Sequence, residues 1–491
     1  MRFTLITIFH ILLIHSAYAN FDWNENCKQA YTNTIQLKFD KANGILENER
    51  SLNPTNSLVY LIENYADYLK IQISEEKNEF DKLKSLKDDR LSIIEDDDSE
   101  SPWKLYSEAE IHLQWAANRL KFGEYFTAAY EINKAFRLLT ENDKKYPHFL
   151  PNKKSLGVLY TLIGSVPKQY NWVLSIIGME GNLDNGLKLM KTTIDEMKTD
   201  SIYSSMVEET YFLYAFLKMN LDNNHIDLKN LLEEIENSDY LLLNFAASRI
   251  ATKLGQNDLA ISILENRIKD KDYYPFHYLD YLIAVGKQNK LDSDCIEYFE
   301  NYVQNFSGLN YKKSALMRIS WQYLLMDDEL NFKKHKNKVN DIGALFVGAD
   351  EEAQDFYKNK LKTHKELLKA RLYFDGGYYE NSLQELDALN QKELENTIYN
   401  YLEFNYRKAR VYEKLENTYE AINFYKQTIE KGKNETFYFS PKSALQLGLI
   451  FEKKGDKNQA SKYFQSCINM QNHLYEKSLE QKAKAGLERL N

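Results

Sequence analysis

The feature that most restricts the fold of this chain is a pattern near its end that recurs every 39 residues. Small residues stand at Ala370, Ala409 and Gly448, with an aromatic residue three positions later and a second small residue twelve positions later. Antiparallel helices pack closely only where small residues let their backbones approach, and a nearby aromatic ring fills the space beside the contact. The pattern therefore predicts an all-α fold, an α-solenoid of antiparallel helix pairs. The aromatic positions are Tyr373, Tyr412 and Phe451, and the second small positions are Ser382, Ala421 and Ala460.

The same arrangement occurs upstream in a weaker form. Ala116 and Ala128 are twelve residues apart around a turn at Gly123, and Ser248 and Ala260 are twelve apart around Gly255. No stretch shows the alternation of a half-buried strand, so we expect helix pairs along the whole mature chain. The predicted regions are an N-terminal helical region over 20–100, degenerate repeats over 101–345 and C-terminal repeats over 346–491.

Three C-terminal stretches resemble tetratricopeptide repeats: ARLYFDGGYYENSLQEL, ARVYEKLENTYEAINFY and LGLIFEKKGDKNQASKYF. That family usually has a period of about 34 residues, so the longer period here indicates longer helices or longer loops. Along its length the chain is similar to exported bacterial repeat proteins of the Bacteroidota kind. The resemblance implies a superhelix in which the first helix of each pair lines a concave face and contacts a partner protein or peptide.

The resemblance places partner contacts on the first helices of the C-terminal pairs. Arg371 and Arg410 occupy equivalent positions one repeat apart, and each guanidinium can hold a carboxylate or a chain terminus. The alternative is that each arginine pairs with a neighbouring Glu or Asp of its own face. The third repeat has Leu449 at this position, so the basic positions are not continuous. The candidate partner-binding residues are Arg371, Phe374, Tyr406, Arg410, Lys414 and Lys453.

Residues 1–19 have the pattern of a secretory signal peptide. Arg2 supplies a positive charge, Phe3 to Ile14 is largely apolar, and Ala17-Tyr18-Ala19 has the small residues of a cleavage site. We expect the mature chain to begin at Asn20 and to be exported as a soluble periplasmic or extracellular protein. A lipid anchor is not expected, because the nearest cysteine, Cys27, lies well past the cleavage point.

Residues 156–179 form the most apolar part of the mature chain and are interrupted by Pro167. The favoured interpretation is a pair of helices buried between two parts of the superhelix. The alternative is an apolar helical hairpin that touches a membrane surface peripherally or lines a groove of lipid size. This segment faintly resembles a region of a eukaryotic tetratricopeptide family linked to the clearance of inclusion bodies near lipid droplets.

Composition and motifs argue against a catalytic, metal-binding or nucleic-acid-binding role for this chain. A net charge of -9 disfavours nucleic acid as a partner. The Gly-x-Ser-x-Gly, His-Glu-x-x-His and phosphate-loop patterns are missing, so no catalytic residue, metal or cofactor is expected. The acidic run from Glu95 to Glu100 lacks the spacing of a calcium loop and is interpreted as a solvated linker. The cysteines Cys27, Cys295 and Cys467 can form at most one disulfide.

These observations favour a non-catalytic scaffold or adaptor in the cell envelope. One alternative is a carbohydrate-binding protein of the nutrient-uptake type, although the five tryptophans mostly fall where core packing explains them. Another is a lipid-associated protein that uses residues 156–179.

Overall fold

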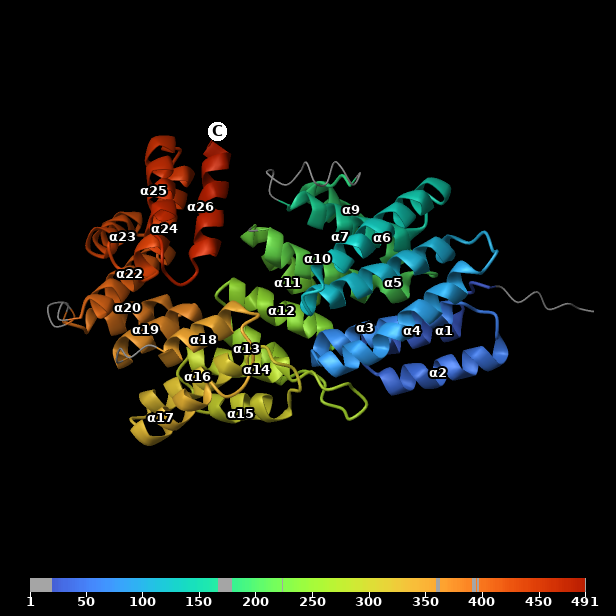
Figure 1. The fold of residues 1–491 in the computed structure, drawn as a ribbon, viewed down its shortest axis with the longest axis horizontal. Helices are drawn as coiled ribbons and strands as arrows, with labels where there is room; N and C mark the ends of the chain where they lie inside the picture. Colours follow the sequence, from blue (N-terminus) through green and yellow to red (C-terminus); the bar gives the residue numbers. More distant parts are fainter. Residues whose placement is uncertain are drawn as a thin grey trace, which may run out of the picture.

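The computed structural model describes residues 20–166, 179–222, 224–358, 363–390, 394 and 397–490. Every secondary-structure element in this part of the chain is helical (Figure 1). The first elements are α1 (Glu25–Ile35), α2 (Phe39–Leu52), α3 (Leu58–Ser74), α4 (Lys77–Glu95), α5 (Pro102–Lys121), α6 (Tyr125–Lys145), α7 (Leu150–Gly164), α9 (Leu183–Thr199), the short η2 (Ser204–Met206), α10 (Val207–Leu221), α11 (His225–Ile235), α12 (Leu241–Lys253) and α13 (Asn257–Glu265).

The remaining elements continue the same series. They are α14 (Tyr278–Asn289), α15 (Cys295–Asn305), α16 (Lys312–Leu325), α17 (Glu329–Lys338), α18 (Gly348–Lys358), α19 (Lys365–Asp375), α20 (Tyr379–Asp387), α22 (Ile398–Lys414), α23 (Thr418–Gly432), α24 (Phe439–Lys453), α25 (Lys457–Asn469) and α26 (Glu476–Leu490). Consecutive helices pack as hairpins, as in α5 with α6, α22 with α23 and α24 with α25. The prediction of an all-α solenoid of helix pairs is confirmed.

Local sequence signals explain where the hairpins turn. Gly123, Gly255, Gly377 and Gly455 have positive φ at the turn between the two helices of a pair, a conformation that costs glycine little. The second helix then often begins at an acidic or amide cap. Asp456, for example, accepts a hydrogen bond from the backbone nitrogen of Gln459 at the start of α25.

The small residues of the repeat are the contact points between paired helices. Ala409 on α22 and Ala421 on α23 are completely buried. At Gly448 a Cβ atom would lie 2.4 Å from the ring of Phe464 on α25, so the aromatic ring occupies the space that a larger residue would need. The Ser382 hydroxyl donates to the carbonyl oxygen of Ala370 at 2.7 Å. The sequence pattern thus reports real helix–helix contacts.

The first helices of successive pairs also pack on one another and form an inner layer. In the C-terminal half this layer runs through α16, α19, α22, α24 and α26, and in the N-terminal half through α3, α5, α7, α10 and α12. The second helices α17, α20, α23 and α25 cover the inner layer of the C-terminal half on one side (Figure 1). Side chains on the other side of the inner layer are therefore not covered by these second helices.

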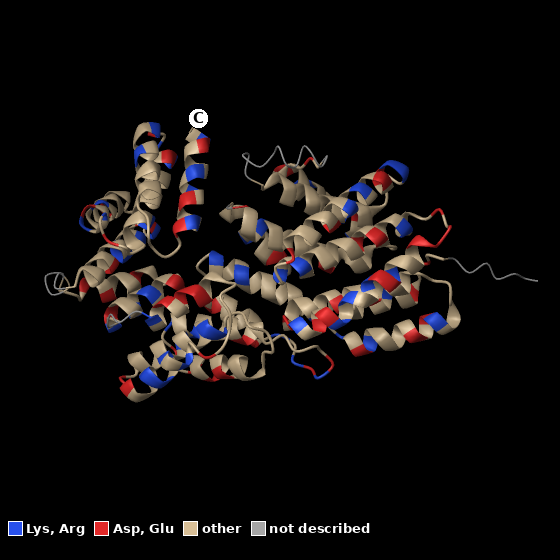
Figure 2. Cartoon of the chain, in the orientation of Figure 1, with Lys and Arg blue, Asp and Glu red and all other residues tan. Residues whose placement is uncertain are grey.

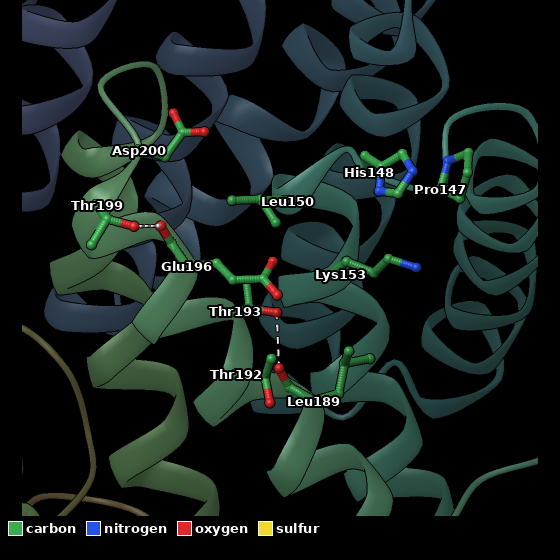
Figure 3. A pocket seen from close by; sticks show the side chains of 10 residues that line it. All are labelled: Pro147, His148, Leu150, Lys153, Leu189, Thr192, Thr193, Glu196, Thr199 and Asp200. Atoms are coloured by element: carbon green, nitrogen blue, oxygen red, sulfur yellow. Dashed lines mark hydrogen bonds between the residues drawn. The ribbon is translucent and has the colours of Figure 1, made fainter.

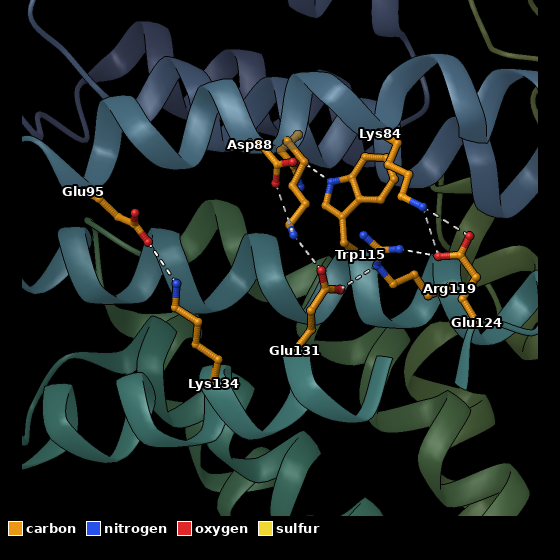
Figure 4. Close-up of polar contacts among 10 residues, drawn as sticks. Lys84, Asp88, Glu95, Trp115, Arg119, Glu124, Glu131 and Lys134 are labelled. Carbon is orange, nitrogen blue, oxygen red and sulfur yellow. Dashed lines mark hydrogen bonds and ion pairs between the residues drawn. The ribbon is translucent and has the colours of Figure 1, made fainter. Parts of the chain in front are cut away.

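Ion pairs tie the second and third hairpins together. Glu131 of α6 is almost completely buried and receives Lys87 of α4 at 2.6 Å and Arg119 of α5 at 3.2 Å (Figure 4). Lys134 of α6 reaches Glu95 at the end of α4 at 2.9 Å. Buried charges are tolerated when each has a partner, so these contacts fix the positions of three helices.

The three cysteines are buried and unpaired, and burial raises the pKa of each thiol to about 12. Within the described ranges, no helix has the length and apolar character needed to cross a bilayer. Residues 1–19, which carry the predicted signal peptide, lie outside the described residues, as do residues 167–178 of the apolar segment. Lys and Arg residues are interspersed with Asp and Glu residues over the helices (Figure 2).

Candidate functional site

Arg410 is held between two aromatic rings on the inner layer of the C-terminal repeats. Its guanidinium lies 4.3 Å from the ring centre of Phe374 on α19 and 5.9 Å from that of Tyr406, one turn earlier on α22. It also donates a hydrogen bond to the Tyr406 hydroxyl at 3.4 Å. Within the described residues Arg410 forms no ion pair, and its nearest charge-stabilising contacts are these two aromatic side chains.

The lowered pKa of the Tyr406 phenol indicates that positive charges lie close to it. Burial alone would raise the pKa of this phenol, but Arg410 and Lys442 lower it below its ordinary value. Lys442 of α24 lies 4.9 Å from the ring centre of Tyr438 and 5.1 Å from that of Tyr475. Two cations on neighbouring inner helices therefore face aromatic rings, an arrangement that attracts a carboxylate.

Arg371 occupies the equivalent position on α19 but has a different environment. Its guanidinium is 2.5 Å from Glu352 of α18 and 3.6 Å from Asp375 on its own helix. It also stacks on Trp321 of α16, 4.8 Å from the ring centre. The charge of Arg371 is thus neutralised inside the protein, and the two equivalent arginines differ in environment.

The remaining predicted residues separate in space. Phe374 and Tyr406 join Arg410, as described above. Lys414 and Lys453 are the last residues of α22 and α24, and both side chains are exposed. No contact of the described residues connects either lysine to the Arg410 cluster.

Several residues of this inner surface escaped the sequence reasoning. Arg407 pairs with Glu403 on the same helix, and both side chains are about nine-tenths buried. These two residues lie three and seven positions before Arg410, so helical spacing alone could have added them. Glu352 lies on α18, Tyr438 directly precedes α24 and Lys442 lies on α24, so only the packing of the superhelix brings them near Arg410 and Arg371.

A small pocket of about 450 Å³ lies between α7 and α9 (Figure 3). Some of its polar side chains are engaged by the protein. Thr193 donates to the carbonyl oxygen of Leu189 at 2.8 Å, and Lys153 pairs with Asp143 at 2.7 Å. The side chains of His148, Thr192 and Glu196 have no hydrogen bond or ion pair with a described residue.

A second cavity of about 780 Å³ lies in the inner layer of the N-terminal half. Its walls come mainly from apolar side chains of α3, α5, α7, α10 and α12. The part of the apolar segment that belongs to α7 contributes in two ways: Leu156 is buried in the core, whereas Leu162 lines the cavity and is partly exposed.

A buried charge cluster adjoins this cavity. Lys154 is fully buried, 2.7 Å from Glu209 and 3.6 Å from Glu110. It also donates to the Tyr65 hydroxyl at 2.9 Å. Burial alone would lower the pKa of Lys154, but the two carboxylates raise it above its ordinary value.

The tryptophans do not form a sugar-binding platform in the described residues. Trp23, Trp103, Trp115 and Trp321 are each less than one-tenth exposed and pack in the core. Trp172 lies outside the described residues. Among the described residues there is also no cluster of three or more His, Cys, Asp or Glu side chains that could hold a metal ion.

The fold and the inner layer define a protein class, the α-solenoids built from tandem helix hairpins. The family model for the tetratricopeptide repeat matches residues 402–430 and 441–473, the hairpins of α22 with α23 and α24 with α25. The resemblance inferred from sequence is thereby confirmed for these two units. No curated protein matches the chain. Tetratricopeptide repeats generally bind other proteins, so protein partners are indicated for this chain.

Proposed function

We propose that this chain is a non-catalytic scaffold whose C-terminal inner layer binds a carboxylate-bearing segment of a partner protein. The observation that carries the proposal is Arg410, a cation on the inner layer that has no ion pair with any described residue. A partner carboxylate would give this guanidinium charge-assisted hydrogen bonds of a kind that the described residues do not provide.

The aromatic neighbours support a peptide as the ligand. Phe374 and Tyr406 fix the guanidinium of Arg410 at 4.3 and 5.9 Å from their ring centres, so little side-chain freedom is lost on binding. Lys442, on the next inner helix, offers a second positive charge beside Tyr438. A short acidic or C-terminal segment laid across α22 and α24 would contact both cations.

Arg371 has a supporting role in this proposal. Because Glu352 and Trp321 already hold its guanidinium, Arg371 joins α16, α18 and α19 and shapes the surface beside the binding residues. Replacing Arg371 would therefore test packing more than recognition.

We further propose that the scaffold acts in the periplasm or outside the cell. The support is the charged start, apolar stretch and small-residue cleavage pattern of residues 1–19. Fractionation of cells that produce the full chain, with determination of the N-terminal residue, tests this point. A cytoplasmic protein that retains Met1 would overturn the localisation without affecting the binding site.

The binding proposal is tested by cross-linking the tagged full chain in its native host and mapping the linked residues by mass spectrometry. Three forms are compared: wild type, Arg410→Met and Arg137→Met. Arg137 is a suitable control because it is exposed on α6 and forms no ion pair with a described residue. Circular dichroism establishes that the variants are folded.

We expect a defined partner that cross-links to α22 or α24 in the wild type and in Arg137→Met. Arg410→Met should lower the affinity for this partner about tenfold or more, because a charge-assisted hydrogen bond is removed. Equal recovery with Arg410→Met, or cross-links confined to other helices, would contradict the proposal.

A further inference from the structure

The cavity in the N-terminal half is elongated. On α10 the lining residues extend from Glu209 to Asn220, and on α5 from Glu110 to Lys121. Eleven residues of an α-helix rise roughly 16 Å, so the cavity runs along most of both helices. Its volume of about 780 Å³ lies within the range of about 300–1,000 Å³ that small-molecule sites occupy.

The cavity is open to solvent beside large apolar side chains. Leu120 of α5, Leu162 of α7 and Phe216 of α10 all line it, and each is more than two-fifths exposed. Exposed apolar groups around an apolar cavity are unfavourable in water and favour a ligand with a long hydrocarbon portion.

The charged side chains that line the cavity differ in whether they have an ion-pair partner. Glu75 pairs with Lys121 at 2.6 Å, and Glu110 and Glu209 share Lys154. Arg249 of α12 is the charged lining residue for which the described part of the chain provides no ion pair. Among the described residues, the cavity therefore presents one positive charge without an ion pair.

Two tyrosines accompany Arg249. Tyr278 and Tyr311 also line the cavity, and their ring centres are 4.8 Å apart. Burial raises the pKa of Tyr278 well above its ordinary value, and Arg249 is close enough to offset part of this rise. One guanidinium beside phenol groups suits a single carboxylate.

We propose that this cavity binds one long-chain fatty acid, with the acyl chain along α5 and α10 and the carboxylate on Arg249. The carboxylates Glu110 and Glu209 would repel the anionic end, so the acid enters with its carboxylate toward Arg249 and its chain toward the buried charge cluster. Pairing with one cation favours a monoanion, and the cavity volume favours a single chain. This site is separate from the residues proposed to bind a partner protein.

The test uses the full mature chain, stripped of bound lipid and titrated with a fluorescent fatty acid. Displacement is then measured with palmitate, with the neutral alcohol of the same chain length and with phosphatidylcholine vesicles. Three variants are compared with the wild type: Arg249→Met, Ala117→Trp, which fills the cavity from α5, and Arg137→Met as the control outside it. Thermal unfolding establishes that each variant is folded.

We expect palmitate to bind the wild type and Arg137→Met at one molecule per chain. Arg249→Met should lower the affinity for palmitate about tenfold to a hundredfold and leave the affinity for the alcohol unchanged, because only the acid has a carboxylate that pairs with Arg249. Ala117→Trp should remove binding of both. The assignment would be overturned if Ala117→Trp left palmitate binding intact, or if Arg249→Met weakened binding of the acid and the alcohol equally. It would also be overturned if the protein bound only vesicles, or if it bound no ligand saturably.

Discussion

Gly377, at the turn between α19 and α20, lies directly against Gly255, at the turn between α12 and α13. A Cβ atom on Gly377 would be 2.3 Å from the carbonyl oxygen of Gly255 and 2.7 Å from its Cα atom. The contact joins the C-terminal repeats to the middle of the chain, and Asn257 adds a hydrogen bond to the Tyr378 hydroxyl at 3.1 Å. Glycine at this turn serves the contact as well as the backbone conformation.

Replacing Gly377 by alanine should destabilise the protein by about 2–4 kcal/mol, because a left-handed residue is strained and the new methyl group overpacks. Gly455→Ala is the matched control, since φ is +77 there and no atom lies within 4 Å of an added Cβ. Gly455→Ala should lower the free energy of unfolding by only about 1–2 kcal/mol. Urea denaturation of the two variants measures the difference, and equal losses would show that the contact with Gly255 is unimportant.

Replacing Glu352 by glutamine should leave Arg371 without its main partner and destabilise the chain by about 1–3 kcal/mol. Burial alone would raise the pKa of Glu352, but Arg371 lowers it below its ordinary value. A lowered carboxyl pKa contributes stability at neutral pH that is lost as the pH falls through that pKa. Wild type and variant should therefore differ at neutral pH and converge in acid. The exposed pair of Lys484 and Glu480 supplies the control, because Glu480→Gln should change stability by less than about 1 kcal/mol.

Replacing Lys154 by methionine should destabilise the chain by about 3–5 kcal/mol, since Glu110 and Glu209 would remain buried without a cation. The double variant Lys154→Met, Glu209→Gln should recover part of this loss. Burial raises the pKa of Glu209. A raised carboxyl pKa favours folding at low pH and disfavours it as the pH rises through that pKa. Thermal unfolding of Lys154→Met should therefore show a larger loss near pH 8 than near pH 5, and the reverse order would contradict this account of the cluster.

His112 should remain neutral in the folded protein far into the acid range. It is 3 % exposed on α5, and neither ring nitrogen has a hydrogen-bond partner among the described residues. Burial lowers its pKa to about 3. The folded state therefore loses stability by about 1.4 kcal/mol per pH unit as the pH falls below about 6.5. His112→Leu should reduce this dependence in thermal unfolding between pH 6.5 and 4.5, roughly the interval over which an unfolded histidine becomes protonated. An unchanged dependence would show that other groups cause it.

The sequence was informative where contacts are local. The spacing of Ala409 and Ala421 reports the closest approach of two consecutive helices, and both residues are completely buried. The positive φ at Gly377 and Gly455 could likewise be expected from glycine in a short turn. Each of these features depends on residues within one hairpin, so a short window of sequence contains every residue that takes part in the contact or the turn.

The candidate site was less accessible to sequence reasoning. Arg371 and Arg410 occupy the same position of the repeat, yet Glu352 neutralises only Arg371. The difference depends on α18, an element inserted between the hairpins of α16 and α19, for which the repeat pattern has no equivalent. The register of a repeat therefore identifies which residues face inward but not which charges remain free.

The sequence by itself determined that this chain folds into helix pairs, because small, aromatic and turn residues act over one hairpin. Only the tertiary structure decided the contact of Gly377 with Gly255, the aromatic environment of Arg410 and the cavity beside Arg249. These features join residues far apart in the chain, and their positions depend on how small rotations between successive hairpins add up along the superhelix.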